Sequence, residues 1–276
     1  MHNNQLLFDT EIPLVMGIIN LTPDSFYYGN RFAADEKLLA KIENMLDNGA
    51  DIIDFGGYST RPGAEFINSD EEIERLTAGL EIVLKKFPDI LVSIDTFRAD
   101  VAENMVKKFG VKIINDIGGG TLDSKMFDTI AKLKVAYILM HTRGNPQNMK
   151  FLTDYQNVTT EVFDFLQKNI AQLRNLGVEN IIADLGFGFA KNTEQNYELL
   201  ANLPLFKELN VPLLVGVSRK SMISNILKTE PADSLNGTTV VNTIALINGA
   251  NILRVHDVKE ARQAIAIYLR YKNYNN

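Results

Sequence analysis

The strongest constraint on the fold is an alternation of short apolar segments with longer amphipathic ones along the whole chain. Each apolar segment is rich in β-branched residues and bounded by Gly, Asn, Asp or Pro, which is typical of strands buried on both faces. Eight such segments occur, at residues 14–19, 51–55, 90–94, 112–115, 135–140, 180–185, 212–217 and 250–255. Helical patterns lie between them, as at 70–86, 101–109, 162–176 and 239–248.

Eight strands that each precede a helix predict an α/β fold of the (β/α)8, or TIM, barrel type. We expect a single domain over residues 1–276, with its barrel core at about 13–272, because no linker or low-complexity tract marks a boundary. A doubly wound open sheet is the alternative, but that fold commonly carries a Gly-rich dinucleotide turn after its first strand. The first strand here is followed instead by Asn20-Leu21-Thr22-Pro23-Asp24.

Composition excludes several classes of function. The chain has no cysteine, which rules out a disulfide framework, a thiolate nucleophile and any zinc site with cysteine ligands. A net charge of −6 without a long basic stripe predicts no binding to nucleic acid. The first ten residues lack the pattern of a signal peptide, and no apolar run is long enough to cross a membrane. We therefore expect a cytoplasmic protein that does not contact a membrane.

Polar residues gather where the predicted strands end. In a barrel of this type, the carboxyl ends of the strands and the loops that follow them form the active face. Charged groups at the ends of buried strands need partners or a ligand, so this pattern predicts a polar site. The residues concerned are Asn20, Asp54, Asp95, Asn115, Asp116, His141, Asp184 and those at 218–221 and 254–257.

Several of these residues also allow a purely structural interpretation. For Asp54 and Asp116 we favour capping of the next segment or hydrogen bonds to nearby loop amides. For His141 we favour a place in the core, and Asp95 taken alone leaves both interpretations open. Asp184 is assigned to function, because no helix starts directly after it that its carboxylate would cap.

Two cationic helix starts are expected after the seventh and eighth strands. Asp257, with Glu260 three residues later, predicts a capping box for the last helix. Ser218 is expected to open the helix after the seventh strand, so that the next two residues lie in its first turn. Helix N-termini attract anions, so these starts predict a phosphate site. The cationic residues beside them are Arg219, Lys220, Arg254 and His256.

The candidate residues divide by chemistry. One group offers carboxylates and an amide that suit the edge of a flat, nitrogen-rich heterocycle: Asp95, Asn115 and Asp184. The other group is cationic and suits a polyanion: Arg61, Lys220, Arg254 and His256. Three histidines are too few for a typical catalytic zinc site, whereas an Mg²⁺ ion with oxygen ligands fits Asn20 together with substrate phosphates.

Five segments resemble the dihydropteroate synthase family. They are GIINLTPDSF at 17–26, STRPG at 59–63, Asp184 with GFGF at 186–189, SRK at 218–220 and RVHDV at 254–258. The resemblance runs in order from about residue 13 to residue 265, which is nearly the whole chain. One such motif is weakly specific, whereas five in the right order on the right barrel units are strongly specific.

The resemblance implies a folate-pathway transferase, with Mg²⁺ as cofactor, that works as a homodimer. It would join 4-aminobenzoate to 6-hydroxymethyl-7,8-dihydropterin diphosphate and release diphosphate. Carried over by position, the pterin site is Asp95, Asn115, Asp184 and Lys220. The diphosphate site is Asn20, Arg61, Arg254 and His256, with the metal at Asn20. The aminobenzoate site is Phe26, Thr60, Pro62, Phe189 and Ser221, and the catalytic residues are Lys220, Arg61 and Asp95.

Such a reaction needs charge stabilisation more than a nucleophile, because diphosphate is a good leaving group. Breaking the C–O bond leaves positive charge on the pterin methylene and negative charge on the diphosphate. We therefore expect a dissociative, SN1-like substitution, in which the aryl amine attacks a trapped cation.

The chain departs from the usual family pattern in four loops. Tyr28 replaces an acidic residue, Tyr58 replaces Glu, Leu185 replaces Pro, and Thr142-Arg143 stands where Met-Gln is usual. A catalytically inactive barrel is therefore one alternative. A pterin-binding methyltransferase module is another, although a folate substrate without diphosphate has little use for a cationic corner.

An apolar stripe near the C-terminus fits either a dimer interface or packing on the barrel: Val240, Val241, Ile244 and Leu246.

Overall fold

Eight parallel strands form a closed barrel in the order β1-β2-β3-β4-β5-β6-β7-β8. The computed structural model describes residues 11–21, 31–58 and 67–274. The strands are β1 Leu14–Asn20, β2 Ile52–Gly56, β3 Val92–Asp95, β4 Ile113–Asp116, β5 Ala136–Met140, β6 Ile181–Asp184, β7 Leu213–Val215 and β8 Ile252–Val255. Each overlaps one of the apolar segments, so the predicted barrel is confirmed and the open sheet is wrong.

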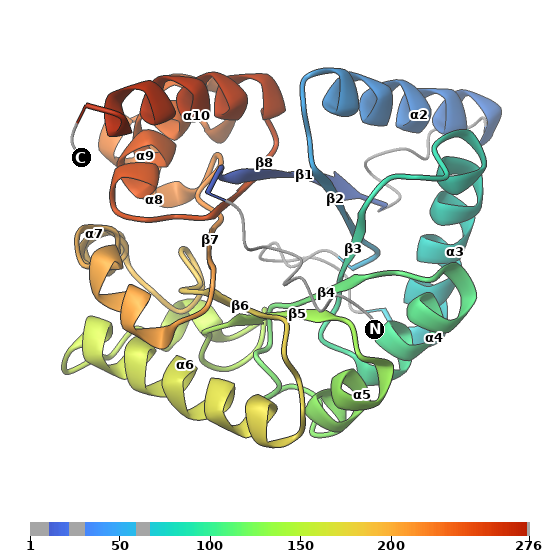
Figure 1. The fold of residues 1–276 in the computed structure, drawn as a ribbon, viewed down its shortest axis with the longest axis horizontal. Helices are drawn as coiled ribbons and strands as arrows, with labels where there is room; N and C mark the ends of the chain where they lie inside the picture. The colour runs from blue at the N-terminus through green and yellow to red at the C-terminus, as the bar shows by residue number, and fades with distance from the viewer. Residues whose placement is uncertain (1–10, 22–30, 59–66, 275–276) are drawn as a thin grey trace.

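Helices form a ring around the strands (Figure 1). They are α2 Arg31–Asp47, α3 Ser69–Lys86, α4 Ala99–Phe109, α5 Met126–Leu133, α6 Val158–Asn175, α7 Thr193–Ala201, α8 Ser221–Leu227, α9 Leu235–Ile247 and α10 Val258–Lys272. Short 3-10 segments lie between them: η1 Met149–Phe151, η2 Leu203–Leu209 and η3 Pro231–Asp233. In the part of the chain that the structure describes, no helix has the length and apolar character needed to span a membrane.

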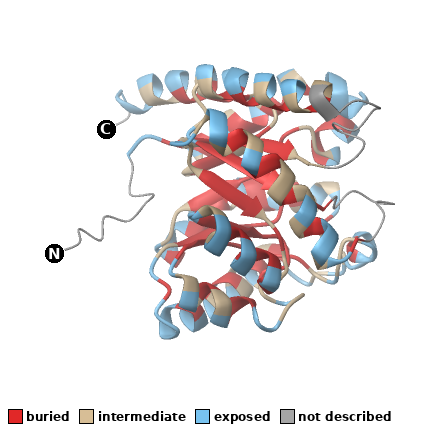
Figure 2. Cartoon of the chain, turned by 90° about the vertical axis from the view of Figure 1, so that its right-hand side faces the viewer, coloured by how far each residue is buried: buried red, intermediate tan, exposed pale blue. Residues whose placement is uncertain are grey.

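Alternation along the strands produces two apolar layers. Residues that point outward pack beneath the helices, and Figure 2 shows the buried strands inside helices whose outer faces are exposed. Residues that point inward form a separate cluster that fills the barrel: Met16, Ile52, Ile113, Ala136, Ile138, Ile182, Leu214 and Ile252. The barrel is therefore solid at this level, and any site must lie above it, toward the carboxyl ends of the strands.

The two predicted helix starts need correction. Helix α8 begins at Ser221 rather than Ser218, because Arg219 adopts a left-handed conformation with φ of 57° and Lys220 is extended at the N-cap. Asp257 occupies the N-cap position of α10 as predicted, but its side chain makes no capping hydrogen bond. The capping box with Glu260 is therefore wrong, since the Asp257 carboxylate binds Arg219 instead.

The apolar stripe of α9 divides between the core and the surface. Val241 and Leu246 are buried against the barrel. Val240, Ile244 and Ile247 lie on the opposite face, where they are 51%, 39% and 51% exposed. Packing on the barrel therefore explains only half of the stripe.

Candidate active site

The period of the strands explains why polar side chains meet above the inner apolar layer. Side chains two positions apart on a strand point to the same face. On four strands the residue two positions beyond an inner apolar residue is polar: Asp54 after Ile52, Asn115 after Ile113, Asp184 after Ile182 and Arg254 after Ile252. A layer of charged and amide groups therefore lies directly on the apolar filling of the barrel.

Arg254 of β8 binds carboxylates from two other strands. Its Nε donates to Asp54 Oδ2 at 2.7 Å, and its Nη2 donates to Asp95 Oδ2 at 2.6 Å. Asn115 Nδ2 also donates to Asp54 Oδ2, at 3.0 Å. The predicted division into an acidic half and a cationic half is thus wrong for Arg254, which lies among the acids.

Burial dominates the electrostatics of this cluster. It raises the pKa of Asp95 to about 7, an effect that Arg254 opposes and the neighbouring Asp54 reinforces. Burial by itself would lower the pKa of Arg254, but Asp54 and Asp95 together hold it above its ordinary value. Within the described residues, the buried Asp54 Oδ1 has no hydrogen-bond partner. Folding has already removed this oxygen from water. A ligand that donates a hydrogen bond to it would therefore gain the bond without a further desolvation cost for the carboxylate.

Asp184 and Lys220 form the other side of the mouth. Asp184, at the end of β6, accepts a hydrogen bond from Gly186 N at 2.8 Å through Oδ1. Lys220 donates to the carbonyl of Phe187, and its Nζ lies 4.5 Å from the centre of the Phe189 ring. Burial raises the pKa of Asp184 and lowers that of Lys220 to about 8, while each group partly offsets the shift of the other.

The loop between β6 and α7 depends on glycine at two positions. Gly186 and Gly188 have φ of 69° and 78°, in the left-handed region that other residues rarely adopt. A β-carbon on Gly186 would collide with the carbonyl oxygen of His141, and one on Gly188 would lie 3.0 Å from Lys220 Cδ. The two glycines therefore allow the loop to approach both β5 and the site lysine.

The two sides of the mouth interact electrostatically. Arg254 lowers the pKa of Asp184, and Asp95 raises that of Lys220. The acid of the sixth unit and the cations of the seventh and eighth units therefore lie close enough to interact at the carboxyl ends of the strands, as the sequence predicts.

His256 lies beside this group on the loop after β8. Its Nδ1 is 3.0 Å from Ser218 Oγ, and its backbone N–H donates to the same hydroxyl at 3.2 Å. Burial and then Arg254 lower its pKa to about 4, so the imidazole is neutral at pH 7. Arg219 binds both oxygens of Asp257, at 2.9 and 2.7 Å, and so ties the two loops together. The predicted phosphate site is therefore formed by the loops after β7 and β8 rather than by the first turns of α8 and α10.

The remaining predicted residues are placed only in part. Asn20 ends β1, and its Oδ1 lies close to Gly56 at the mouth. Phe189 is half-buried beneath Lys220, whereas Ser221 is exposed at the start of α8. The predicted residues Phe26, Thr60, Arg61 and Pro62 lie outside the described residues.

The sequence favoured a purely structural role for Asp54, Asp116 and His141, and this prediction is confirmed for the last two and wrong for Asp54. Asp116 accepts from Gly118 N, Gly120 N and the Tyr137 hydroxyl, so its oxygens serve the β4 loop. His141 is buried, with its ring edge-on to a phenylalanine 5.0 Å away. Asp54, however, belongs to the site rather than to a cap. The sequence feature that could have indicated this is its position on the strand, two residues after the inner apolar residue Ile52.

The departures from the family pattern fall on packing contacts where the structure describes them. Leu185 is fully buried in the outer apolar layer. Tyr58 packs edge-on against Phe97, with Arg98 5.3 Å from its ring centre. Arg143 stacks on a tyrosine ring and forms an ion pair with Glu161. None of these residues displaces a group at the barrel mouth, and Tyr28 lies outside the described residues.

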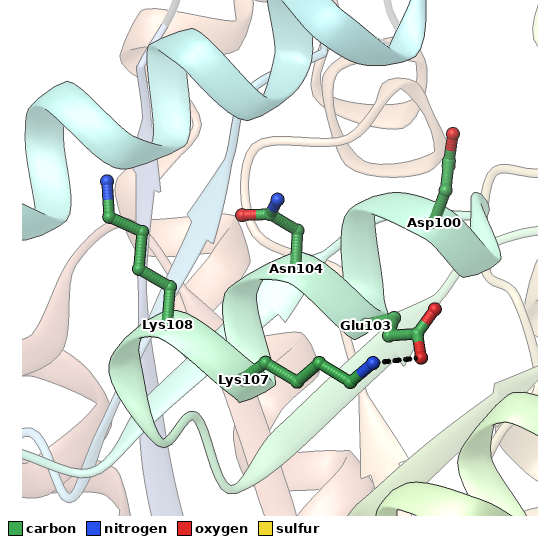
Figure 3. A pocket seen from close by; sticks show the side chains of 5 residues that line it. All are labelled: Asp100, Glu103, Asn104, Lys107 and Lys108. Carbon is green, nitrogen blue, oxygen red and sulfur yellow. Dashed lines mark hydrogen bonds and ion pairs between the residues drawn. The ribbon is translucent and has the colours of Figure 1, made fainter.

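A depression on the outer face of α4 is a separate feature (Figure 3). It is lined by Asp100, Glu103, Asn104, Lys107 and Lys108. Lys107 pairs with Glu103 at 2.6 Å, and Lys108 pairs with Glu81 at 2.9 Å. Both of its lysines are already paired with glutamates, so we assign it no site.

The fold and the mouth together define a (β/α)8-barrel enzyme with a buried polar site at the carboxyl ends of its strands. The sequence model of the family described as "Pterin binding enzyme" matches residues 16–256. The dihydropteroate synthase of Synechocystis sp. is 44% identical over 263 residues, which covers 94% of this chain and 90% of that protein. The chain belongs to the dihydropteroate synthase family of pterin-binding enzymes.

Solved structures agree with this assignment. A dihydropteroate synthase from Clostridium difficile, crystallised in the presence of pteroic acid, superposes with a TM-score of 0.88 at 38% identity, over 95% of this chain and 97% of that one. The Xanthomonas albilineans dihydropteroate synthase with 4-aminobenzoic acid superposes with a TM-score of 0.86 at 35% identity, over 95% and 94% of the two chains.

Proposed function

We propose that this chain catalyses the dihydropteroate synthase reaction of folate biosynthesis. It condenses 6-hydroxymethyl-7,8-dihydropterin diphosphate with 4-aminobenzoate, giving 7,8-dihydropteroate and diphosphate. The observation that carries the proposal is the convergence of Asp184, Lys220 and the Asp95–Arg254 pair on one barrel mouth. The relatives described above support it, since one was crystallised with pteroic acid and another with 4-aminobenzoic acid.

The pterin is proposed to bind to Asp95, Asn115, Asp184 and Lys220. A pterin edge presents several N–H donors and ring acceptors side by side. Asp184 has one oxygen on Gly186 N, which leaves the other to accept from the ligand. Buried carboxylates match such donors well, because a hydrogen bond to a charged group is stronger away from water.

The diphosphate is proposed to bind to Asn20, Arg254 and His256, and to Arg61 of the β2 loop. Arg254 uses Nε and Nη2 on the two carboxylates, so its Nη1 has no partner among the described residues and remains a donor for phosphate oxygens. The low pKa of His256 rises when an anion binds beside it, because the anion stabilises the charged imidazolium.

The chemical step is proposed to be dissociative. The C–O bond of the pterin methylene breaks, and its electron pair leaves with the diphosphate, where Arg254 and His256 stabilise the negative charge. The amine of 4-aminobenzoate, held at Phe189 and Ser221 with Phe26, Thr60 and Pro62, supplies the electron pair of the new C–N bond. The amine then loses a proton to solvent. Asp95, Lys220 and Arg61 act by placing and stabilising charge, so the step needs no enzyme nucleophile.

Mg²⁺ fits this site as an ion held by few protein ligands and mainly by water and phosphate oxygens. Among the described residues, no group of three His, Asp or Glu side chains is placed to hold a metal ion. Mg²⁺ commonly takes only one or two protein oxygens and completes its shell with water and phosphates. Asn20 offers such an oxygen at the mouth, so we propose that it holds Mg²⁺ together with the diphosphate. The ion would supply positive charge to the leaving group.

A coupled assay for diphosphate release tests the function. We expect release only when both substrates are present, and loss of activity on chelation with recovery on adding Mg²⁺. Release without 4-aminobenzoate would indicate a hydrolase. No release, with pterin still bound in calorimetry, would indicate the catalytically inactive barrel.

The lowered pKa of Lys220, about 8, predicts a pH-dependent affinity. Below pH 8 the ammonium is charged and attracts the diphosphate ester, and above it the charge is lost. Affinity for the pterin diphosphate should therefore fall as pH rises from 7 to 9. The variant Lys220→Met should bind about tenfold more weakly at pH 7, equivalent to about 1.4 kcal/mol, and show a flatter profile. Calorimetry at both pH values measures this, and equal slopes for the two proteins would remove Lys220 from the site.

We also propose a homodimer and a cytoplasmic location. The exposed side chains of Val240, Ile244 and Ile247 on α9 support the dimer. Sedimentation equilibrium should give twice the chain mass of 30.9 kDa, and a monomer at all concentrations would contradict it. The absence of cysteine supports a reducing compartment, and cell fractionation would test the location.

A further inference from the structure

Lys191 is a buried lysine behind the loop at residues 186–189, and only 8% of it is exposed. Its Nζ donates to Gly186 O and to Phe189 O, each at 3.0 Å, and lies 3.0 Å from His141 Nδ1. Its Nζ also donates to the carbonyl oxygen of His141, at a longer 3.4 Å. We assign the Lys191 amine as the donor in the contact with the ring, so that His141 accepts through Nδ1 and carries its proton on Nε2.

Burying this lysine costs free energy, which its hydrogen bonds have to offset. Lysine is almost never fully buried unless it is paired. Within the described residues, no carboxylate lies within ion-pair distance, 4 Å, of Lys191. Burial lowers its pKa far below the ordinary value, and Asp184 only partly offsets this. The hydrogen bonds to uncharged acceptors in the loop and on His141 offset part of the free energy that burying the amine costs.

The loop that Lys191 holds also makes three contacts in the site. Gly186 N donates to Asp184, Phe187 O accepts from Lys220, and the Phe189 ring lies beneath Lys220 Nζ. Two of its four residues are glycines with positive φ, so the backbone has little stiffness of its own. Lys191 binds the carbonyls at the first and last positions of this loop and so clamps both of its ends.

His141 connects the clamp to the barrel. It follows directly after β5, and its backbone N–H donates to Asp184 O at 3.0 Å. Its ring packs edge-on against Phe165 of α6, which fixes the orientation of Nδ1. The acceptor for Lys191 is thus held by a strand and a helix rather than by another loop.

We propose that Lys191, seated on His141, is a positioning residue that sets the affinity of the site for the pterin substrate by holding the 186–189 loop in place. Its amino group is directed at the loop and His141 rather than at the substrate. It acts through Asp184, Lys220 and Phe189, whose positions depend on that loop. The inference rests on the pterin-binding role proposed above for Asp184 and Lys220.

The test is the variant Lys191→Met, which nearly keeps the length of the side chain and removes its hydrogen-bond donors. With saturating 4-aminobenzoate, we expect the KM for pterin diphosphate to rise at least tenfold while kcat changes less than threefold. Calorimetry with pterin diphosphate alone should show the same loss of affinity. A control is Val162→Ala, a buried change on α6 that weakens the fold and removes no hydrogen bond of the loop, and it should leave KM unchanged. A Lys191→Met protein with unchanged KM would overturn the proposal, whatever its kcat.

Variants of His141 test the same proposal should Lys191→Met fail to fold. His141→Asn keeps an acceptor oxygen near the position of Nδ1, whereas His141→Leu removes it. We expect a KM within twofold of the native value for His141→Asn and a rise of fivefold or more for His141→Leu. Equal KM values for the two variants would overturn the proposal.

Two further variants separate this inference from the proposed function. If Asp184→Asn and Lys220→Ala weaken pterin binding but Lys191→Met does not, only the positioning role fails. If all three bind as the native protein does, the assignment of the pterin site itself fails.

Discussion

Replacing Arg254 with methionine is expected to lower the free energy of unfolding by about 3–5 kcal/mol at pH 8, the usual cost of removing one partner of a buried ion pair. The variant leaves Asp54 and Asp95 without their cation in a site where Asp54 is fully buried. Urea denaturation would measure the change. A matched control is Arg262→Met, since Arg262 pairs with Asp51 at a more exposed position, and we expect a loss of about 1 kcal/mol or less there.

The pH dependence of this loss follows from the pKa of Asp95. That pKa is about 7 in the folded protein, above the ordinary 3.8, mainly because the carboxyl is buried. A carboxyl whose folded pKa is raised favours folding when protonated, so its contribution to stability grows as pH falls through 7 toward 4. Without Arg254 the same group takes up a proton more readily. The destabilisation by Arg254→Met should therefore shrink between pH 8 and pH 5, and a loss that stays constant over that range would contradict the buried pair.

Substituting Asp184 by asparagine should weaken binding of the pterin diphosphate about 100-fold, or about 3 kcal/mol, the size of one or two hydrogen bonds to a charged acceptor. The asparagine oxygen can keep the bond from Gly186 N, but its amide group then presents hydrogens where the ligand also has donors. Calorimetry at pH 7 measures the effect, and native affinity would contradict the assignment.

The same substitution should not harm the fold. Burial disfavours the Asp184 carboxylate and raises its pKa, so a neutral amide in that place should leave the melting temperature unchanged or raise it. The control Asp100→Asn changes a charge on the outer face of α4 and should alter neither property. A large loss of stability in Asp184→Asn would mean that the carboxylate serves the fold rather than the ligand.

Much of the site could be read from the strands, because their period is regular. The inner apolar residues occur two positions before Asn115, Asp184 and Arg254, so alternation alone places those side chains at the barrel mouth. The same argument applies to Asp54, for which the sequence favoured a cap. The error arose from weighing the residue type, which often caps or turns, above its position on the strand.

The loops were harder to predict, because their conformation depends on partners distant in sequence. Ser218 resembles a helix N-cap, yet Arg219 turns into a left-handed conformation and binds Asp257, 38 positions away. That pair also removes the carboxylate from the predicted capping box. No local pattern indicates the contact between Arg219 and Asp257, since the sequence around each of them matches an ordinary helix start.

Lys191 shows the same limit more sharply. In the sequence it is one lysine near the start of a polar helix, where exposure is the usual outcome. Only the fold brings His141, 50 positions earlier, to within 3.0 Å of its amine. The sequence by itself determined the closed barrel and the end of it that carries polar groups, because both follow from the spacing of apolar residues along single strands. The tertiary structure decided which charges pair and which loops are held, because these depend on hydrogen bonds between units that meet only when the barrel closes.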